Sequence, residues 1–169
     1  TLLRRCLDGL FDKTNYAAME IIVVDNRSDD PGTLDYLAAL KAEGRISLLH
    51  YDAPFNFAAI NNFAVRHAAG DLVCLLNNDV EPIGDEWLGE MVGQALRPEI
   101  GAVGAMLYYP NDTIQHAGIY LDGNVADHFY VGQPRGIPGD MSRACLAQNL
   151  SAVTAACLVI RKSVWDEVG

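Results

Sequence analysis

Apolar residues recur every three or four positions at the start of the chain and then give way to short, unbroken apolar runs. The helical spacing predicts a helix over residues 2–12, and the β-branched run at 20–25 predicts a buried strand. Similar patterns predict helices that begin at 31, 56 and 85 and strands at 46–50, 71–76 and 101–107. Strands that alternate with helices favour an α/β fold with a mostly parallel sheet.

The pattern changes after residue 107. Short β-like segments at 114–121 and 125–131 precede a stretch rich in Gly and Pro at 132–140, which predicts a loop. An apolar run at 153–160 predicts a last strand before a short helix. We therefore expect one domain over 1–169 with two unlike halves, 1–107 and 108–169.

Composition narrows the class of protein. The chain has 169 residues, a formal net charge of −10 and 50% hydrophobic residues, which is a globular composition. The negative charge argues against binding to nucleic acid. Its longest apolar runs are far shorter than the roughly 18–20 residues that span a bilayer. The four widely spaced cysteines (Cys6, Cys74, Cys145 and Cys157) form no CxxC pair, which argues against zinc and favours a reducing compartment.

Two acidic segments follow predicted strands, where ligands bind in open α/β sheets. The first is Asp25-Asn26-Arg27-Ser28, whose carboxylate can accept hydrogen bonds from a base or a ribose. The second is Asn77-Asn78-Asp79, whose oxygen atoms suit a hard divalent cation such as Mg²⁺. Either segment can also be an ordinary turn, because Asn and Asp favour turns. The chain lacks the GxGxxG, GxxxxGK[ST] and GxSxG motifs.

Several segments together carry a resemblance to a known family. They are residues 21–28, 55–62, 68–71, 76–82, 115–118 and 155–162. In their order and spacing the sequence resembles the family 2 glycosyltransferases with the GT-A fold, within a bacterial surface-polysaccharide, rhamnosyltransferase-like branch. The resemblance implies a three-layer α/β/α arrangement, with a nucleotide-sugar-binding half at 1–107 and an acceptor-side half at 108–169.

The resemblance also implies site residues. Asp25 matches the acid that contacts the base or ribose of the donor, with Asn26 and Ser28 beside it. Asn62 matches a residue that shapes the donor pocket. The segment Asn77-Asn78-Asp79 matches the DXD motif with its first Asp replaced by Asn, so that Asp79 holds Mg²⁺ or Mn²⁺ on the donor diphosphate.

The family mechanism implied is an inverting displacement that uses a general base. In the family this base belongs to an acidic pair that would lie beyond Gly169, so no catalytic residue is assigned within the chain. The family's first strand would precede Thr1. We therefore expect a truncated catalytic domain that is inactive in isolation and exposes sheet edges.

The implied donor is a nucleotide-diphosphate sugar, and the implied acceptor is a glycan or a lipid-linked glycan. We expect a cytoplasmic enzyme of cell-surface polysaccharide synthesis, with peripheral association at the inner face of the membrane left open. Two alternatives are a non-catalytic nucleotide-sugar-binding module and a flavodoxin-like regulatory domain. In the second half, His116 and His128 are either acceptor contacts or ordinary structural histidines.

Overall fold

A computed structural model describes residues 1–168. Its first part alternates helices and strands in the predicted order. The elements are α1 (Leu2–Asp12), β1 (Ile22–Asp25), α2 (Pro31–Ala42), β2 (Ser47–His50), α3 (Phe57–Val65), β3 (Leu72–Leu76), α4 (Trp87–Ala95) and β4 (Ala102–Gly104). The predicted helices and strands of this part are therefore confirmed, with ends that differ by a few residues, except that the strand expected at 101–107 is divided into β4 and a separate strand that begins at Leu107.

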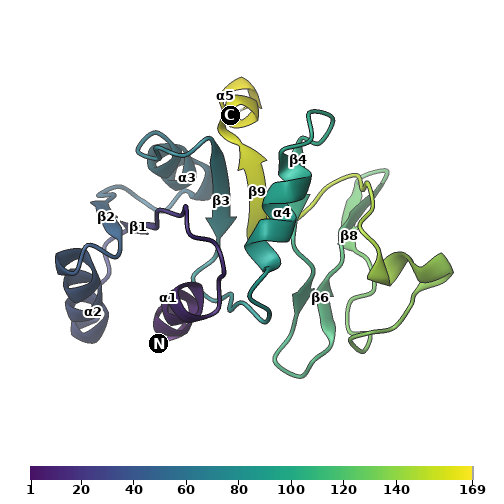
Figure 1. The fold of residues 1–169 in the computed structure, drawn as a ribbon, viewed down its shortest axis with the longest axis horizontal. Coiled ribbons are helices and arrows are strands. Elements are labelled where there is room, and N and C mark those ends of the chain that lie inside the picture. The colour runs from purple at the N-terminus through teal and green to yellow at the C-terminus, as the bar shows by residue number, and fades with distance from the viewer. Residues whose placement is uncertain (169) are drawn as a thin grey trace.

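The second part is built from short elements. They are β5 (Leu107–Tyr108), β6 (Ile114–His116), β7 (Ile119–Asp122), β8 (Val125–His128), the 3-10 helix η1 (Asp140–Cys145), β9 (Cys157–Arg161) and α5 (Lys162–Val168). Figure 1 shows β1 and β2 beside α2 at one end of the molecule, β3, β9 and β4 in the middle, and the strands β6 and β8 at the other end. The central sheet thus combines strands of both predicted halves, β3 and β4 from the first and β9 from the second.

Side-chain caps explain where the helices of the first part begin. The Asp30 carboxylate accepts the Thr33 backbone N–H at 2.8 Å, and Pro31 occupies the first turn of α2. In the same way, the Asn56 side chain accepts the Ala59 backbone N–H at 3.0 Å at the start of α3. Both caps satisfy backbone donors that a helix leaves unpaired at its N-terminus.

The strand pairing differs from the expected mostly parallel sheet, which is not confirmed. Strands β1 and β2 pair in parallel, but β9 lies between β3 and β4 and runs antiparallel to both. The chain between β4 and β9 folds into hairpins at one end of the central sheet and returns directly. A parallel neighbour would instead need a crossover to the opposite end. As a result, β3 and β4 share one direction without being neighbours.

Two apolar clusters hold these elements together. One joins α4 to the central sheet through Leu88, Met91, Val92, Ala95, Cys157 and Val159. The other packs α1 against α2 and the approach to β2 through Leu7, Leu10, Leu37, Leu40 and Ile46. Helix α4 is therefore packed on the central sheet, and α1 is packed on α2.

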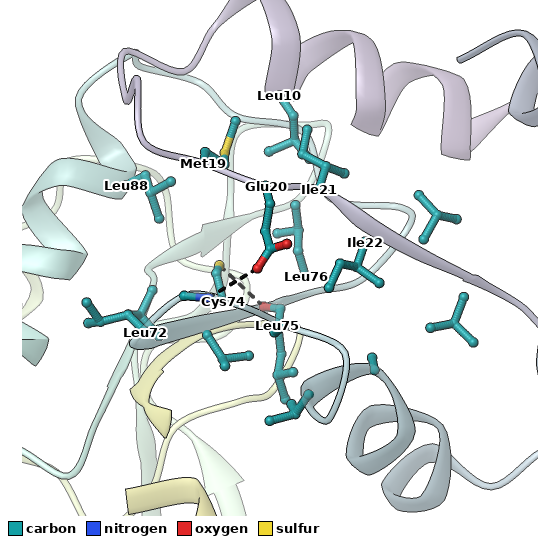
Figure 2. A pocket seen from close by; sticks show the side chains of 18 of the residues that line it. Leu10, Met19, Glu20, Ile21, Ile22, Leu72, Cys74, Leu75, Leu76 and Leu88 are labelled. Carbon is teal, nitrogen blue, oxygen red and sulfur yellow. Dashed lines mark hydrogen bonds between the residues drawn. The ribbon is translucent and has the colours of Figure 1, made fainter. Parts of the chain in front are cut away.

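A cavity of about 530 Å³ lies between β1 and β3. Figure 2 shows mainly aliphatic side chains around it, among them Ile21, Ile22, Leu75 and Leu76. Within the described residues, β1 pairs only with β2 and β3 only with β9, so each of these two strands has one edge without a strand partner. The apolar lining does not suit a phosphate or a sugar, although Ser28 and Asn78 also border the space.

Gly104 provides a test of how closely β4 packs. A Cβ added at Gly104 would lie 2.5 Å from the Cβ of Val153, whereas one added at Gly93 in α4 would meet nothing within 4 Å. We predict that Gly104→Ala lowers the free energy of unfolding by roughly 1–3 kcal/mol, because Val153 has to move. The matched control Gly93→Ala should be neutral or slightly stabilising. Equal urea midpoints for the two variants would contradict this packing.

Candidate functional site

Asp25 ends β1 and is only 9% exposed. Its Oδ1 accepts the Ser28 backbone N–H at 3.0 Å, and its Oδ2 lies 3.4 Å from Nδ1 of His50 on β2. Burial alone would raise the pKa of Asp25, but the hydrogen bonds from Ser28 and His50 outweigh it and hold the pKa below the ordinary value. The site therefore contains a buried, ionised acceptor at the carboxyl end of a strand.

The residues after Asp25 join two loops. Asn26 donates both amide hydrogens to the backbone carbonyls of Tyr51 and Ala53, at 2.7 and 2.8 Å. Arg27 adopts a left-handed backbone with φ of 63° and forms an ion pair with Asp52 at 2.5 Å. Asn26, expected from the resemblance to bind the donor, thus has its donor groups committed to the loop after β2. These two hydrogen bonds join the loop after β1 to the loop after β2.

The segment Asn77-Asn78-Asp79 follows β3 as a tight turn. The Asn77 backbone N–H donates to the Ala156 carbonyl at 2.9 Å, and the Asn77 carbonyl accepts the Val80 N–H at 3.2 Å. Asn78 and Asp79 are exposed beyond this turn. The backbone at the end of β3 is therefore fixed, while the side chains of Asn78 and Asp79 are open to a ligand.

Helix α1 anchors the chain immediately after this turn. The two carboxylate oxygens of Glu81 pair with Arg5 at 2.7 Å and with Lys13 at 2.8 Å. These hydrogen bonds lower the pKa of Glu81. Gly9 lets α1 approach closely, because a Cβ there would lie 2.9 Å from Pro82. The sequence reasoning missed the supporting roles of Arg5, Lys13 and Glu81, because these partners lie about 70 positions apart in the chain.

Cys6 on α1 contacts the turn that follows β3. The Cys6 thiol donates to the Asn77 carbonyl at 3.6 Å. Burial, together with the negative charge of Asp79, raises the pKa of Cys6 to about 11. The thiol therefore stays protonated, and it supports the Asn77 backbone as a weak donor.

Asn62 lies on α3 and connects to α5. The indole N–H of Trp165 donates to Oδ1 of Asn62 at 2.9 Å. Its neighbour Asn61, together with Ser28 and Asn78, lines the cavity between β1 and β3. The structure therefore brings the segments after β1 and β3 to one cavity, and it ties Asn62 to α5.

The acidic residues present fit only part of a metal site. No group of three or more His, Cys, Asp or Glu side chains that could hold a metal ion occurs within residues 1–168. Asp79 nevertheless offers an exposed carboxylate, and Asn78 offers an amide oxygen next to it. Mg²⁺ usually combines one or two carboxylates with water and substrate phosphates, so this donor set suits an ion that arrives with a diphosphate. The expected base position beyond Gly169 lies outside the described residues.

Comparison with known proteins gives consistent matches. The sequence model of glycosyl transferase family 2 matches residues 1–169. Uncharacterized protein y4gI of Sinorhizobium fredii (strain NBRC 101917 / NGR234) is 44% identical over 99% of this chain and 19% of that protein. The O-antigen biosynthesis protein RfbC of Myxococcus xanthus is 39% identical over 99% of this chain and 13% of that protein. The chain thus spans less than a fifth of either relative.

A solved structure is also similar. It is mannosyltransferase PcManGT from Pyrobaculum calidifontis in complex with GDP-Man and Mn²⁺. The match has a TM-score of 0.55 and 26% sequence identity, and it covers 66% of this chain and 33% of that one. Among the helices of residues 1–168, none combines the length and apolar character that crossing a membrane requires.

The hydrogen bonds of Asp25 predict how acid affects stability. A carboxyl whose pKa is lowered by folding stabilises the folded state above its unfolded pKa, and this contribution is lost as the pH falls through the folded value. We predict that Asp25→Asn costs about 1 kcal/mol near pH 7 and reduces the loss of stability below about pH 4. Urea unfolding at pH 7 and pH 3 measures both effects. The exposed control Asp71→Asn should lose as much stability between pH 7 and pH 3 as the wild type does. If Asp25→Asn also lost as much, the hydrogen bonds assigned to ionised Asp25 would be contradicted.

Proposed function

The chain belongs to glycosyl transferase family 2, and from that premise we propose that it forms the donor-binding part of a sugar transferase with the GT-A fold. The proposed reaction moves a sugar from a nucleotide-diphosphate donor to a glycan or lipid-linked glycan. The name of the Myxococcus relative supports a role in cell-surface polysaccharide synthesis. The GDP-Man and Mn²⁺ bound by the similar mannosyltransferase support a nucleotide-sugar donor and a divalent cation.

One observation carries the proposal: the segments that follow β1 and β3 lie close together, since Ser28 of the first and Asn78 of the second border the same apolar cavity, although that cavity does not itself suit the donor. The buried Asp25 accepts the Ser28 backbone N–H in the first segment, and the exposed Asp79 follows Asn78 in the second. An ionised acceptor on one side suits the hydroxyl groups of a ribose or the N–H groups of a base. An exposed carboxylate with an adjacent amide on the other side suits a cation bound to a diphosphate.

The residues then have separate tasks in an inverting displacement. Asp25 orients the nucleoside, Asn26 holds the Asp25 loop, and Asp79 with Asn77 and Asn78 faces the diphosphate. An acceptor hydroxyl attacks the anomeric carbon while the bond from that carbon to the diphosphate oxygen breaks, and a base outside the described residues takes the hydroxyl proton. A divalent cation, when bound, stabilises the charge that develops on the departing nucleoside diphosphate.

Asp79 provides the direct test of this proposal. We predict that Asp79→Ala weakens the binding of GDP- and UDP-sugars in Mn²⁺ at least about tenfold, because it removes the only carboxylate of the turn. Asp71→Ala, at the opposite end of β3, is the matched control and should bind as the wild type does. Calorimetry with and without Mn²⁺ makes the measurement. If Asp79→Ala kept the metal-dependent affinity of the wild type, the assignment would be wrong.

The non-catalytic alternative has its own discriminating experiment. A nucleotide-sugar-binding module would bind the donor but would transfer no sugar in the presence of acceptors. We propose that the longer protein transfers sugar and that residues 1–169 alone transfer little. The open cavity beside the unpaired edges of β1 and β3 supports the second part. Release of nucleoside diphosphate, measured for both proteins, separates these outcomes, and equal turnover by residues 1–169 would contradict that second part.

The location of the protein in the cell is the last part of the proposal. We propose a cytoplasmic protein that works at the inner face of the membrane when its acceptor is carried by a lipid. The formal charge of −10 gives no support for direct attraction to anionic lipid.

A further inference from the structure

A second pocket, of about 330 Å³, lies in the half of the chain after residue 107. Strand β6 ends in His116, and strand β8 ends in Asp127 and His128, so the two strands bring these side chains to one wall. Thr154 and Ala156, from the segment that leads into β9, line the same space. We call this space the histidine pocket. Its volume falls at the lower end of the range for small-molecule sites.

The pocket adjoins the proposed donor site through one backbone hydrogen bond. The Ala156 carbonyl accepts the Asn77 N–H at 2.9 Å, and Ala156 itself lines the histidine pocket. Asn77 begins the turn that carries Asn78 and Asp79. A ligand in the histidine pocket would therefore lie beside the turn proposed to face the donor diphosphate.

The hydrogen bonds of the two histidines determine which nitrogen carries each proton. His116 is 1% exposed, and its Nε2 accepts the Thr154 backbone N–H at 3.4 Å. A neutral imidazole carries one proton, so that of His116 lies on Nδ1. This Nδ1 is 3.1 Å from Nδ1 of His128, which therefore accepts. The proton of His128 then lies on Nε2.

Burial keeps the His116 imidazole neutral. Burial, followed by the charge of a protonated His128, lowers the pKa of His116 to about 4. The Gln115 carbonyl lies 3.3 Å from Nδ1 of His128, so it would favour a proton on that nitrogen. With a proton on Nδ1 of His128, however, two N–H groups would point at each other, because Nδ1 of His116 also carries its proton. The geometry therefore favours His128 with its proton on Nε2.

Nε2 of His128 is open to a ligand. Every buried side-chain nitrogen or oxygen within the described residues has a hydrogen-bond partner, and no partner is recorded for Nε2 of His128. That atom is therefore accessible from the pocket or from solvent. Asp127 lines the same pocket, and its carboxylate is held by two hydrogen bonds: Oδ1 accepts the His128 backbone N–H at 2.7 Å, and Oδ2 accepts the Tyr120 hydroxyl at 3.5 Å.

We propose that the histidine pocket binds hydroxyl groups of the acceptor glycan. This inference rests on the proposed function and names the acceptor side of that same site. Nε2–H of His128 donates a hydrogen bond to a sugar hydroxyl oxygen, and the Asp127 carboxylate accepts a hydrogen bond from a hydroxyl O–H. A neighbouring donor and acceptor of this kind match the dual character of a sugar hydroxyl. His116 is a positioning residue, because it fixes the proton of His128 without needing to touch the ligand.

The test uses the full-length protein, the nucleotide sugar that it hydrolyses from a panel of GDP-, UDP- and dTDP-sugars, and methyl glycosides of common hexoses and 6-deoxyhexoses as acceptor probes. We expect His128→Ala to raise the acceptor KM about tenfold or more, which corresponds to one lost hydrogen bond to a ligand. The donor KM and the slow hydrolysis of donor without acceptor should stay unchanged. His128→Gln, whose amide can donate in place of Nε2–H, should recover part of the acceptor KM.

Two further variants separate the roles. His67→Ala removes an exposed histidine at the end of α3 and should behave as the wild type. His116→Phe keeps a ring of similar size, and it should raise the acceptor KM as His128→Ala does while leaving the donor KM unchanged. Thermal unfolding of each variant shows whether it is folded. If His116→Phe does not fold, the comparison of His128→Ala with His128→Gln still tests the role of His128.

The outcomes distinguish this inference from the proposed function. Absence of donor binding and donor hydrolysis in the wild type would overturn both. A wild type that hydrolyses donor but uses none of the glycosides would overturn the acceptor assignment alone. So would an unchanged acceptor KM in folded His128→Ala, or a donor KM that rises in parallel with the acceptor KM.

Discussion

The insertion of β9 between β3 and β4 is the constraint on which the rest of the arrangement depends. Because β9 runs antiparallel to β3, Cys157 lies opposite Leu76, and the chain that enters β9 passes the carboxyl end of β3. The hydrogen bond from Asn77 to the Ala156 carbonyl continues this pairing beyond the strands. One backbone register therefore places the turn that carries Asp79 beside the hairpins that carry His116 and His128.

Long-range contacts then convert flexible loop sequences into fixed positions. Glu81 is held by Arg5 of α1 and by Lys13 directly after it, and Asn26 is held by two carbonyls of the loop after β2. In both cases the residue that is held lies one or two positions from a residue proposed to face a ligand. A preorganised site of this kind spends little conformational entropy when the ligand binds. Exposed side chains such as Asp79 can therefore act from a rigid backbone.

The sequence predicts the local elements well, because helix caps and apolar periodicity are local signals. Asp30 and the apolar run before Asn77 are examples, and both lie where the pattern indicates. The order and direction of the strands are not local signals. The direction of β9 depends on the end of the central sheet at which the hairpins between β4 and β9 return the chain. The expected mostly parallel sheet is not confirmed for that reason. Nothing in the pattern around Ala156 indicates that it pairs with a residue 79 positions away.

The candidate site residues also differ in whether a local pattern reveals them. Asp25 and Asp79 could be selected because acids at strand ends are a local pattern, and the resemblance added Asn62. The commitment of Asn26 to carbonyl groups and the pairing of His116 with His128 depend on loops that meet only in the folded chain. Residue type alone does not reveal them.

The most direct measurement is a crystal structure with Mn²⁺ and a nucleoside diphosphate, in which anomalous scattering locates the metal. We predict one strong anomalous peak within coordination distance of the Asp79 carboxylate, with the nucleoside beside Asp25. A peak at the His116–His128 pair, or a nucleoside bound away from the ends of β1 and β3, would contradict it.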